Sequence, residues 1–340
     1  MSLSPLQQEL AISTVKVLVI FSALMTLFSL MTYVERRVLA FMQFRLGPNR
    51  TGPFGLLQPV ADGIKLFFKE EVIPAGANKL LFVAAPALAV VTAFMAVAVV
   101  PYGGTIHIAG RAIPLQISDL DVGVLYLFAI SSLGVYGIVM AGWAANNKYT
   151  LIGGLRSSAQ MFSYELALGL SFVSLILVAG SFRIHDIVDS QTGFFLFKWN
   201  AFRQLPAFAV FLVAATAEVN RTPFDLPEAE TELVAGFHTE YSSMRFALLQ
   251  MAEYINMITA SAVGANLFLG GWHFGITGVP DSPLWFIGKM LAFLFFFIWL
   301  RGTVPRFRYD QLMHFGWKVL VPVAMAWIFV AAGLVLWRQA

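Results

Sequence analysis

The chain has 340 residues, of which 59% are hydrophobic and only 12% charged, with a formal net charge of +3 and no cysteine. Soluble domains carry roughly a quarter charged residues, so this composition excludes an ordinary soluble protein and predicts one integral membrane domain over residues 1–340. The scattered basic residues exclude a nucleic-acid-binding face. Without cysteine the chain cannot hold an iron–sulfur cluster by the usual four-thiolate route, so any electron carrier must belong to a partner.

Eight segments are long and apolar enough to cross a bilayer, because a spanning helix needs about 20 mostly apolar residues. They lie near residues 13–33, 80–101, 122–142, 159–180, 203–220, 244–269, 284–301 and 318–337. Irregular backbone cannot face lipid, so the polar connections are expected at the two surfaces. The predicted fold class is an all-α polytopic membrane protein with eight transmembrane helices.

The basic residues predict the orientation of these spans. Most of the 22 Lys and Arg residues lie on the side that the chain reaches after its first span, and the side richer in Lys and Arg is normally cytoplasmic. Both termini are therefore expected on the periplasmic side. The connections around residues 35–79, 143–158, 218–241 and 302–317 are expected on the cytoplasmic side.

The first cytoplasmic connection contains a segment with helical periodicity, from Pro59 to Glu70. Its two faces are apolar (Val60, Ile64, Phe67 and Phe68) and charged (Asp62, Lys65 and Lys69). This pattern predicts an amphipathic helix that lies in the plane of the membrane surface. Just before it, Glu35 and Arg36 are expected to end the first span as charged interface anchors.

The buried carboxylates are the sharpest chemical signal, because an acidic side chain at the centre of a spanning helix costs about 2.5–3.5 kcal/mol on insertion scales. Glu165 is expected roughly 10 Å along a helix that starts near residue 159. Glu253 shares one helix face with Gln250 and Asn256, at i−3 and i+3, and Glu218 lies where the fifth span ends. Each could be a helix–helix hydrogen bond, but together they favour a proton or ion path.

The stretch from Glu218 to Tyr241 is where this apolar chain gathers charge. Arg221 lies among its acidic residues, which are Glu218, Asp225, Glu228, Glu230, Glu232 and Glu240. A solvated loop, a docking surface for a basic partner and a proton-loading vestibule all agree with the charge. The last cytoplasmic connection carries Arg301, Arg306 and Arg308, which fit either interface anchors or charge partners of this acidic stretch.

The sequence offers no cofactor or metal site of its own. The five histidines all lie in predicted connections, and none is paired on a membrane helix, so intramembrane haem or zinc binding is not predicted. The chain also lacks a Walker A pattern, a Gly-rich dinucleotide fingerprint and a nucleophile elbow. No NADH or ATP site is therefore expected in this chain.

Four runs of the sequence closely resemble one family: YVERRVLAFMQFRLGPNRTGPFGLLQPVADGIKLFFKE, SYELALGL, AEVNRTPFDLPEAETELVAGFHTEYSSMRFALLQMAEY and RGTVPRFRYDQLMHFGWK. The family is the quinone-site membrane subunit of respiratory complex I, NADH:quinone oxidoreductase. Its mitochondrial members are known as NADH dehydrogenase subunit 1. The likeness extends over essentially the whole chain, including eight spans with both termini outside.

The resemblance implies that the chain builds, with hydrophilic partner subunits, a tunnel from the bilayer to the terminal iron–sulfur cluster in the bacterial inner membrane. Quinone is then the substrate, while NADH, FMN and the iron–sulfur clusters belong to partners, and small membrane subunits lie alongside. By motif, the tunnel and its entrance would involve Glu35, Arg36, Arg45, Asp62, Lys65 and Arg301. The proton path would involve Glu165, Glu218, Arg221, Asp225, Glu228, Glu230, Glu232, Glu240, Glu253 and Tyr254.

The resemblance also implies a mechanism, in which quinone reduction changes the charge in the cavity and the carboxylate path responds by altered protonation. No complete catalytic site is expected in this chain alone. Two other functions remain open: a transporter that moves protons or cations without partners, and the anchor subunit of a related membrane-bound hydrogenase. Ion flux through the purified chain in liposomes would favour the first, and quinone reductase activity of the assembled complex would argue against both.

Overall fold

The fold is a bundle of long helices, and the computed structural model describes residues 4–108, 111–193, 198–226, 233–276 and 279–339. The main helices are α1 (Pro5–Met42), α3 (Lys79–Val97), α4 (Gly123–Ala144), α5 (Lys148–Ala179), α9 (Leu205–Glu218), α11 (Ser243–Leu269), α12 (Pro283–Thr303) and α14 (Val321–Gln339). The shorter helical segments are η1 (Pro53–Gly55), α2 (Gln58–Phe68), α6 (Ile184–Asp189), α8 (Asn200–Arg203), η2 (Gly236–His238), α13 (Tyr309–Phe315) and the π-helical turn Gly316–Leu320.

A helix occupies each of the eight segments predicted as spans. Among the described residues, six helices are long and apolar enough to cross a membrane, and the last of them joins α13, the π-helical turn and α14. The shorter α9 is an apolar helix of 14 residues. Helix α11 has 27 residues but is not among the six. The structure therefore agrees with an all-α polytopic membrane protein.

Helix α1 is longer than predicted at both ends. A capping box between Ser4 and Gln7 begins it, and it continues past the expected end near residue 33 to Met42. Glu35 and Arg36 therefore lie inside a continuous helix rather than ending it. The prediction was wrong because it took the charged pair as a membrane boundary, whereas Glu35 is buried against the bundle.

Helix α5 also begins earlier than predicted, at Lys148 instead of near residue 159. The side chain of Asn147 accepts a hydrogen bond from the backbone amide of Tyr149 and so caps its first turn. Most of the expected loop 143–158 is thus helix. Glu165 lies about 25 Å from the start of α5 at 1.5 Å per residue, which is much deeper than the predicted distance of about 10 Å.

One short hairpin departs from the all-α prediction. Strands β1 (Thr105–Ile108) and β2 (Arg111–Pro114) pair antiparallel, with Thr105 opposite Pro114. The hairpin lies between two spans, outside the apolar runs that the prediction followed. The predicted amphipathic helix is confirmed as α2, whose apolar side chains Phe67 and Phe68 are exposed.

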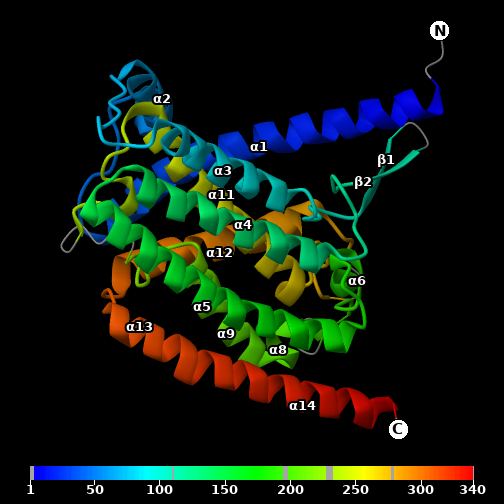
Figure 1. Cartoon of the computed structure of the whole chain (residues 1–340). Coiled ribbons are helices and arrows are strands. Elements are labelled where there is room, and N and C mark those ends of the chain that lie inside the picture. Colours follow the sequence, from blue (N-terminus) through cyan, green and yellow to red (C-terminus); the bar gives the residue numbers. More distant parts are fainter. Residues whose placement is uncertain (1–3, 109–110, 194–197, 227–232, 277–278, 340) are drawn as a thin grey trace.

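The centre of the bundle is formed by α3, α4, α5, α9 and α11, with α1 along one side and α14 along the opposite side (Figure 1). Small residues allow the central helices to approach closely. A Cβ atom on Gly137 of α4 would lie 3.0 Å from the Cβ of Ala89 on α3. Both termini lie at the end that carries α6 and the hairpin, and α2 and α13 lie at the other end (Figure 1).

Candidate functional site

A buried charge cluster is centred on Glu35, near the end of α1. Arg221 Nη1 lies 3.0 Å from Glu35 Oε1, Arg301 Nη1 pairs with the same oxygen, and the Tyr254 hydroxyl donates to Glu35 Oε2 at 2.7 Å. Glu35 is only 3% exposed, and a buried charge is tolerated only when it is paired and hydrogen-bonded. The cluster therefore ties α1 to α11, α12 and the segment after α9.

The segment after α9 positions Arg221 because Gln160 of α5 holds its backbone. The Gln160 side-chain amide donates to the carbonyl oxygens of Ala217, at 2.8 Å, and Phe224, at 2.7 Å. The guanidinium of Arg221 lies 4.4 Å from the ring centroid of Tyr254. Burial lowers the pKa of Arg221, but the charge of Glu35 outweighs this and raises it, so the guanidinium stays protonated.

A cavity of about 240 Å³, here called the outer cavity, opens beside this cluster. Glu35, Arg221, Tyr254 and Arg301 line it, and so does Glu253 of α11. The remaining lining residues are Arg36, Leu39, Asn220, Thr222, Asp225 and Gln250. Residues predicted separately for the quinone tunnel and for the proton path therefore share one polar cavity.

A second cavity of about 110 Å³, here called the inner cavity, lies deeper between the central helices. Its walls are mainly apolar, but Glu218, Glu253, Asn256 and Ser131 line it as well. Glu253 and Asn220 border both cavities. The predicted polar face of α11 is confirmed, since Gln250 lines the outer cavity and Asn256 the inner one. Glu253 is thus the carboxylate common to the two cavities.

Serine side chains connect the inner cavity to Glu165. Ser131 Oγ of α4 lies 3.4 Å from Glu165 Oε1, and the hydroxyl of Ser132 donates to the same oxygen. Ser131 also borders the inner cavity beside Glu218, whose Oε2 is buried without a hydrogen-bond partner among the described residues. A sequence of polar groups therefore leads from Glu35 through Glu253 and the inner cavity to Glu165.

The other predicted tunnel residues lie at the junction of α1 and α2. Arg36 Nη1 is 2.6 Å from Asp62 Oδ2, and Lys65 Nζ is 3.6 Å from Asp62 Oδ1. Burial raises the pKa of Asp62, but the hydrogen bond from Arg36 outweighs this, so the pKa is lowered. Since Arg36 also lines the outer cavity, it connects α2 to it. Arg45 instead donates to Gln43 at the exposed end of α1.

The acidic stretch divides between several surroundings. Buried Asp225 accepts a hydrogen bond of 2.9 Å from Arg306, which agrees with the alternative that the last arginine cluster pairs with this stretch. Glu240 accepts a hydrogen bond of 2.6 Å from Asn147 and lines neither cavity. Glu228, Glu230 and Glu232 lie outside the described residues.

The sequence prediction missed residues that carry no charge or lie in connections. Ser131 and Ser132 stand out only as adjacent hydroxyls within an apolar run, and Gln160 as a lone amide in a helix. His238 was assigned to a connection, yet its Nε2 lies 3.7 Å from Glu253 Oε1. Each of these residues could be recognised as a buried polar group, but its partner could not.

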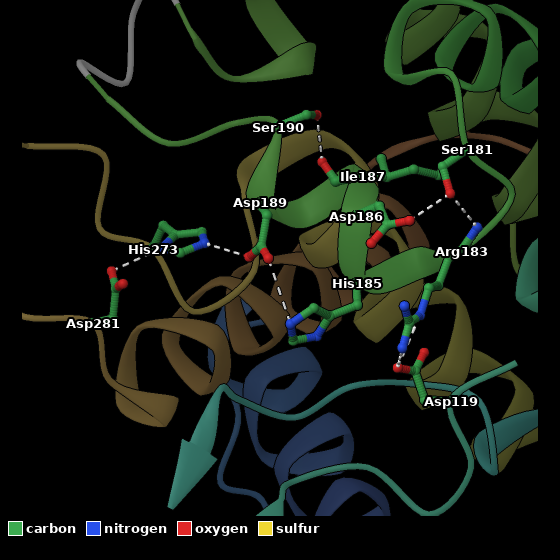
Figure 2. Close-up of polar contacts among 10 residues, drawn as sticks. All are labelled: Asp119, Ser181, Arg183, His185, Asp186, Ile187, Asp189, Ser190, His273 and Asp281. Atoms are coloured by element: carbon green, nitrogen blue, oxygen red, sulfur yellow. Dashed lines mark hydrogen bonds and ion pairs between the residues drawn. The ribbon is translucent and has the colours of Figure 1, made fainter. Parts of the chain in front are cut away.

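A second polar cluster lies at the opposite end of the bundle, between α6 and the α11–α12 connection (Figure 2). Asp189 stands between two imidazoles, with His273 Nε2 at 3.2 Å and His185 Nε2 at 3.5 Å, and His273 Nδ1 lies 2.9 Å from Asp281 Oδ1. Burial lowers the pKa of His273, but its bonds to the two carboxylates outweigh this and raise it. The cluster clamps one connection onto the other.

Comparison with known proteins identifies one family. The family model for NADH dehydrogenase matches residues 15–332. A relative from Geobacter metallireducens, the first of two H-type subunits of its NADH-quinone oxidoreductase, is 51% identical over 99% of this chain and 100% of its own length. The H-type subunit of the NADH-quinone oxidoreductase of Thermomicrobium roseum is also 51% identical, over 97% of this chain and 98% of its own length.

Proposed function

The chain belongs to the NADH dehydrogenase family as a membrane subunit of an oxidoreductase complex, and we propose that it guides quinone and couples quinone reduction to proton translocation. The observation that carries this proposal is the position of Glu253, which borders both the outer and the inner cavity. Electron carriers and NADH belong to partner subunits, because the chain has no cysteine to hold an iron–sulfur cluster. This chain supplies the membrane part of the quinone route and the beginning of the proton path.

The quinone entrance is proposed at the junction of α1 and α2. Exposed apolar side chains on α2, including Phe67 and Phe68, offer a surface for an isoprenoid tail. The Arg36–Asp62 pair lies beside this surface, and Arg36 also borders the outer cavity. A quinone leaving the bilayer would therefore pass from an apolar surface to a charged one. Its reduction is proposed to take place beyond, in the hydrophilic partner subunits.

Electrostatics explains how chemistry outside this chain could reach Glu253. Two guanidinium groups, Arg221 and Arg301, face the single carboxylate of Glu35, so the cluster responds to any negative charge that develops nearby. If an anionic quinone species attracts these groups, Glu35 loses part of its stabilisation and gains affinity for a proton. Glu253 shares the outer cavity with this cluster and feels the same change.

The inner cavity then relays the change toward the membrane arm. A proton that moves between Glu253 and Glu218 crosses a space bordered by both carboxylates. From there Ser131 reaches Glu165 on the far side of α4. A hydroxyl can donate one hydrogen bond while it accepts another, so it can relay a proton without becoming charged. Antiporter-like partner subunits are proposed to complete translocation across the membrane.

The proposed location is the bacterial inner membrane, with eight crossings and both termini on the periplasmic side. The two termini lie at one end of the bundle, as an even number of crossings requires (Figure 1). The outer cavity lies near the opposite end, where basic residues such as Arg36 and Arg306 gather, and that end is assigned to the cytoplasm. Hydrophilic partners would then cover the outer cavity, and small membrane subunits would flank the bundle.

The test compares Glu253→Gln with Glu240→Gln in the assembled complex reconstituted into liposomes. Both variants remove one carboxylate, but only Glu253 borders the cavities. We expect Glu253→Gln to lower both quinone reductase activity and proton pumping by at least about tenfold, the scale of a lost proton-transfer group. Glu240→Gln should retain both activities. Wild-type reductase activity and pumping in Glu253→Gln would overturn the proposed path.

A further inference from the structure

His238 is enclosed next to the carboxylate that joins the two cavities. It ends the short helix η2, it is 4% exposed, and its ring centroid lies 4.0 Å from that of Phe237 and 5.8 Å from that of Phe246. Its Nε2 faces Glu253 Oε1 at 3.7 Å. Phe237, its neighbour in the chain, borders the inner cavity. A titratable ring is therefore held in apolar surroundings against Glu253.

The other ring nitrogen determines how this imidazole can carry a proton. His238 Nδ1 lies 2.9 Å from the backbone carbonyl oxygen of Ala235. A carbonyl oxygen only accepts hydrogen bonds, so Nδ1 must carry a hydrogen in both the neutral and the protonated ring. In the neutral ring, Nε2 is then an acceptor with its lone pair toward Glu253.

The two facing atoms consequently need a proton between them. A neutral imidazole facing an ionised carboxylate would set two acceptors against each other in an enclosed site, which is unfavourable. Two arrangements avoid this: a protonated Glu253 that donates to Nε2, and an ionised Glu253 beside a protonated ring. The two arrangements have the same total charge. They differ only in whether the proton sits on Glu253 Oε1 or on His238 Nε2.

We infer that His238 and Glu253 together hold one exchangeable proton, so that His238 positions and replenishes the proton at the junction of the two cavities. This inference rests on the proposed function and deepens it. Transfer breaks the Nε2–H bond and forms the Oε1–H bond, and the bond from Nδ1 to Ala235 stays in place. Glu253 can then pass a proton into the inner cavity and regain one without leaving an unpaired buried charge.

The chain approaches closely enough for this pairing because α5 has a glycine opposite η2. A Cβ atom on Gly153 would lie 2.8 Å from the backbone nitrogen of Phe237 and 2.9 Å from the Cα of Gly236. Any larger residue at position 153 would push η2 away from α5. The sequence therefore provides the space that keeps the imidazole against α11.

The test uses three variants in the assembled complex: His238→Gln, His238→Asn and the double variant His238→Gln with Glu253→Gln. The amide side chains can still donate hydrogen bonds, but they do not take up a proton near neutral pH. His314→Gln is the matched control, because His314 is an exposed histidine on α13. Pumping in liposomes is measured together with the infrared difference spectrum on quinone reduction, in which the carboxyl band of Glu253 is assigned by its loss in Glu253→Gln.

The inference predicts that both single variants lower pumping about tenfold, below the full range for a lost proton-transfer group because Glu253 remains. The double variant should pump no more slowly than Glu253→Gln alone, as expected for residues that act as a unit. The carboxyl band of Glu253 should shift in His238→Gln and stay unchanged in His314→Gln. A band that is unchanged in His238→Gln would overturn the shared proton. Normal pumping in Glu253→Gln would instead overturn the proposed path, and the band would still decide on the pair.

Discussion

Tyr254 of α11 and Glu35 of α1 are 219 positions apart in the chain, and the tyrosine hydroxyl donates a 2.7 Å hydrogen bond to Glu35 Oε2. The same tyrosine ring lies under the guanidinium of Arg221, which pairs with the other oxygen of Glu35. Through this contact the longest helix of the bundle is attached to the helix that carries Glu253. A change at Glu35 is therefore one side chain away from the junction of the two cavities.

Replacing Tyr254 by Phe tests this attachment. A hydrogen bond to a charged group contributes about 1.5–3 kcal/mol, and we expect a loss toward the lower limit because two arginines still pair with Glu35. Coupled turnover should fall several-fold. Thermal unfolding and proton pumping of the assembled complex would measure both effects. Tyr126→Phe is the control, since Tyr126 donates only to the carbonyl of Met95, and equal effects in the two variants would refute a special role for Tyr254.

Asp62→Asn tests the proposed quinone entrance. The Arg36–Asp62 pair is partly exposed, so its loss should cost less than about 1 kcal/mol of stability. We expect a higher apparent KM for quinone with little change in kcat, because the pair lies at the approach and not at the reacting atoms. The pKa of Asp62 is lowered, so the pair keeps its charge at neutral pH and is lost only as the pH falls through that lowered value.

The control for this entrance is Asp310→Asn, because Asp310 also pairs with an arginine, Arg308, but on the exposed surface of α13. Its apparent KM for quinone should equal that of the wild type. An unchanged KM in Asp62→Asn, measured with a quinone that has a long isoprenoid tail, would remove the α1–α2 junction from the quinone route.

Gly153→Ala tests the close approach of η2 to α5. The added Cβ would lie 2.8 Å from the Phe237 backbone nitrogen, and such overpacking typically costs about 1–3 kcal/mol. Gly288→Ala is the control, because a Cβ there meets nothing within 4 Å. That substitution in helix α12 should be neutral or stabilising by up to about 1 kcal/mol. Equal melting temperatures of the two variants would contradict the packing argument.

The His273 cluster predicts a pH dependence of stability (Figure 2). Its two carboxylate partners raise the pKa of His273 above the usual 6.5. The folded state then binds the proton more tightly than the unfolded state, so the stabilisation is complete below pH 6.5 and is lost as the pH rises through the raised pKa. Thermal unfolding from acid to alkaline pH should show this decline in the wild type but not in His273→Gln. A decline of equal size in the variant would exclude His273 as its source.

The sequence predicted the main helices well because each is a long apolar run, and this property is local. It failed where tertiary pairing overrides local polarity. Glu35 looked like the end of α1, but two arginines and a tyrosine from distant segments allow the helix to continue. Lys148 to residue 158 looked like a loop for the same reason. The β1–β2 hairpin could not be predicted from apolar runs, because it lies outside all of them.

The chemistry of the site was predicted in type but not in arrangement. Buried carboxylates such as Glu165 and Glu253 were recognisable from the cost of placing them in a membrane helix. Their partners were not, because Glu35 and Arg301 are 266 positions apart and no periodicity links them. The family resemblance named the residues of two separate groups. Only the folded chain brings the groups together at the outer cavity and adds His238 and Ser131.

The central claim is that Glu253 connects events at the outer cavity to Glu165. The most direct measurement is the infrared difference spectrum of the assembled complex after a single turnover of quinone reduction. The carboxyl band of Glu165 is assigned by its loss in Glu165→Gln. The account predicts that this band responds to quinone reduction in the wild type and no longer responds in Glu253→Gln. The same response in both proteins would contradict it.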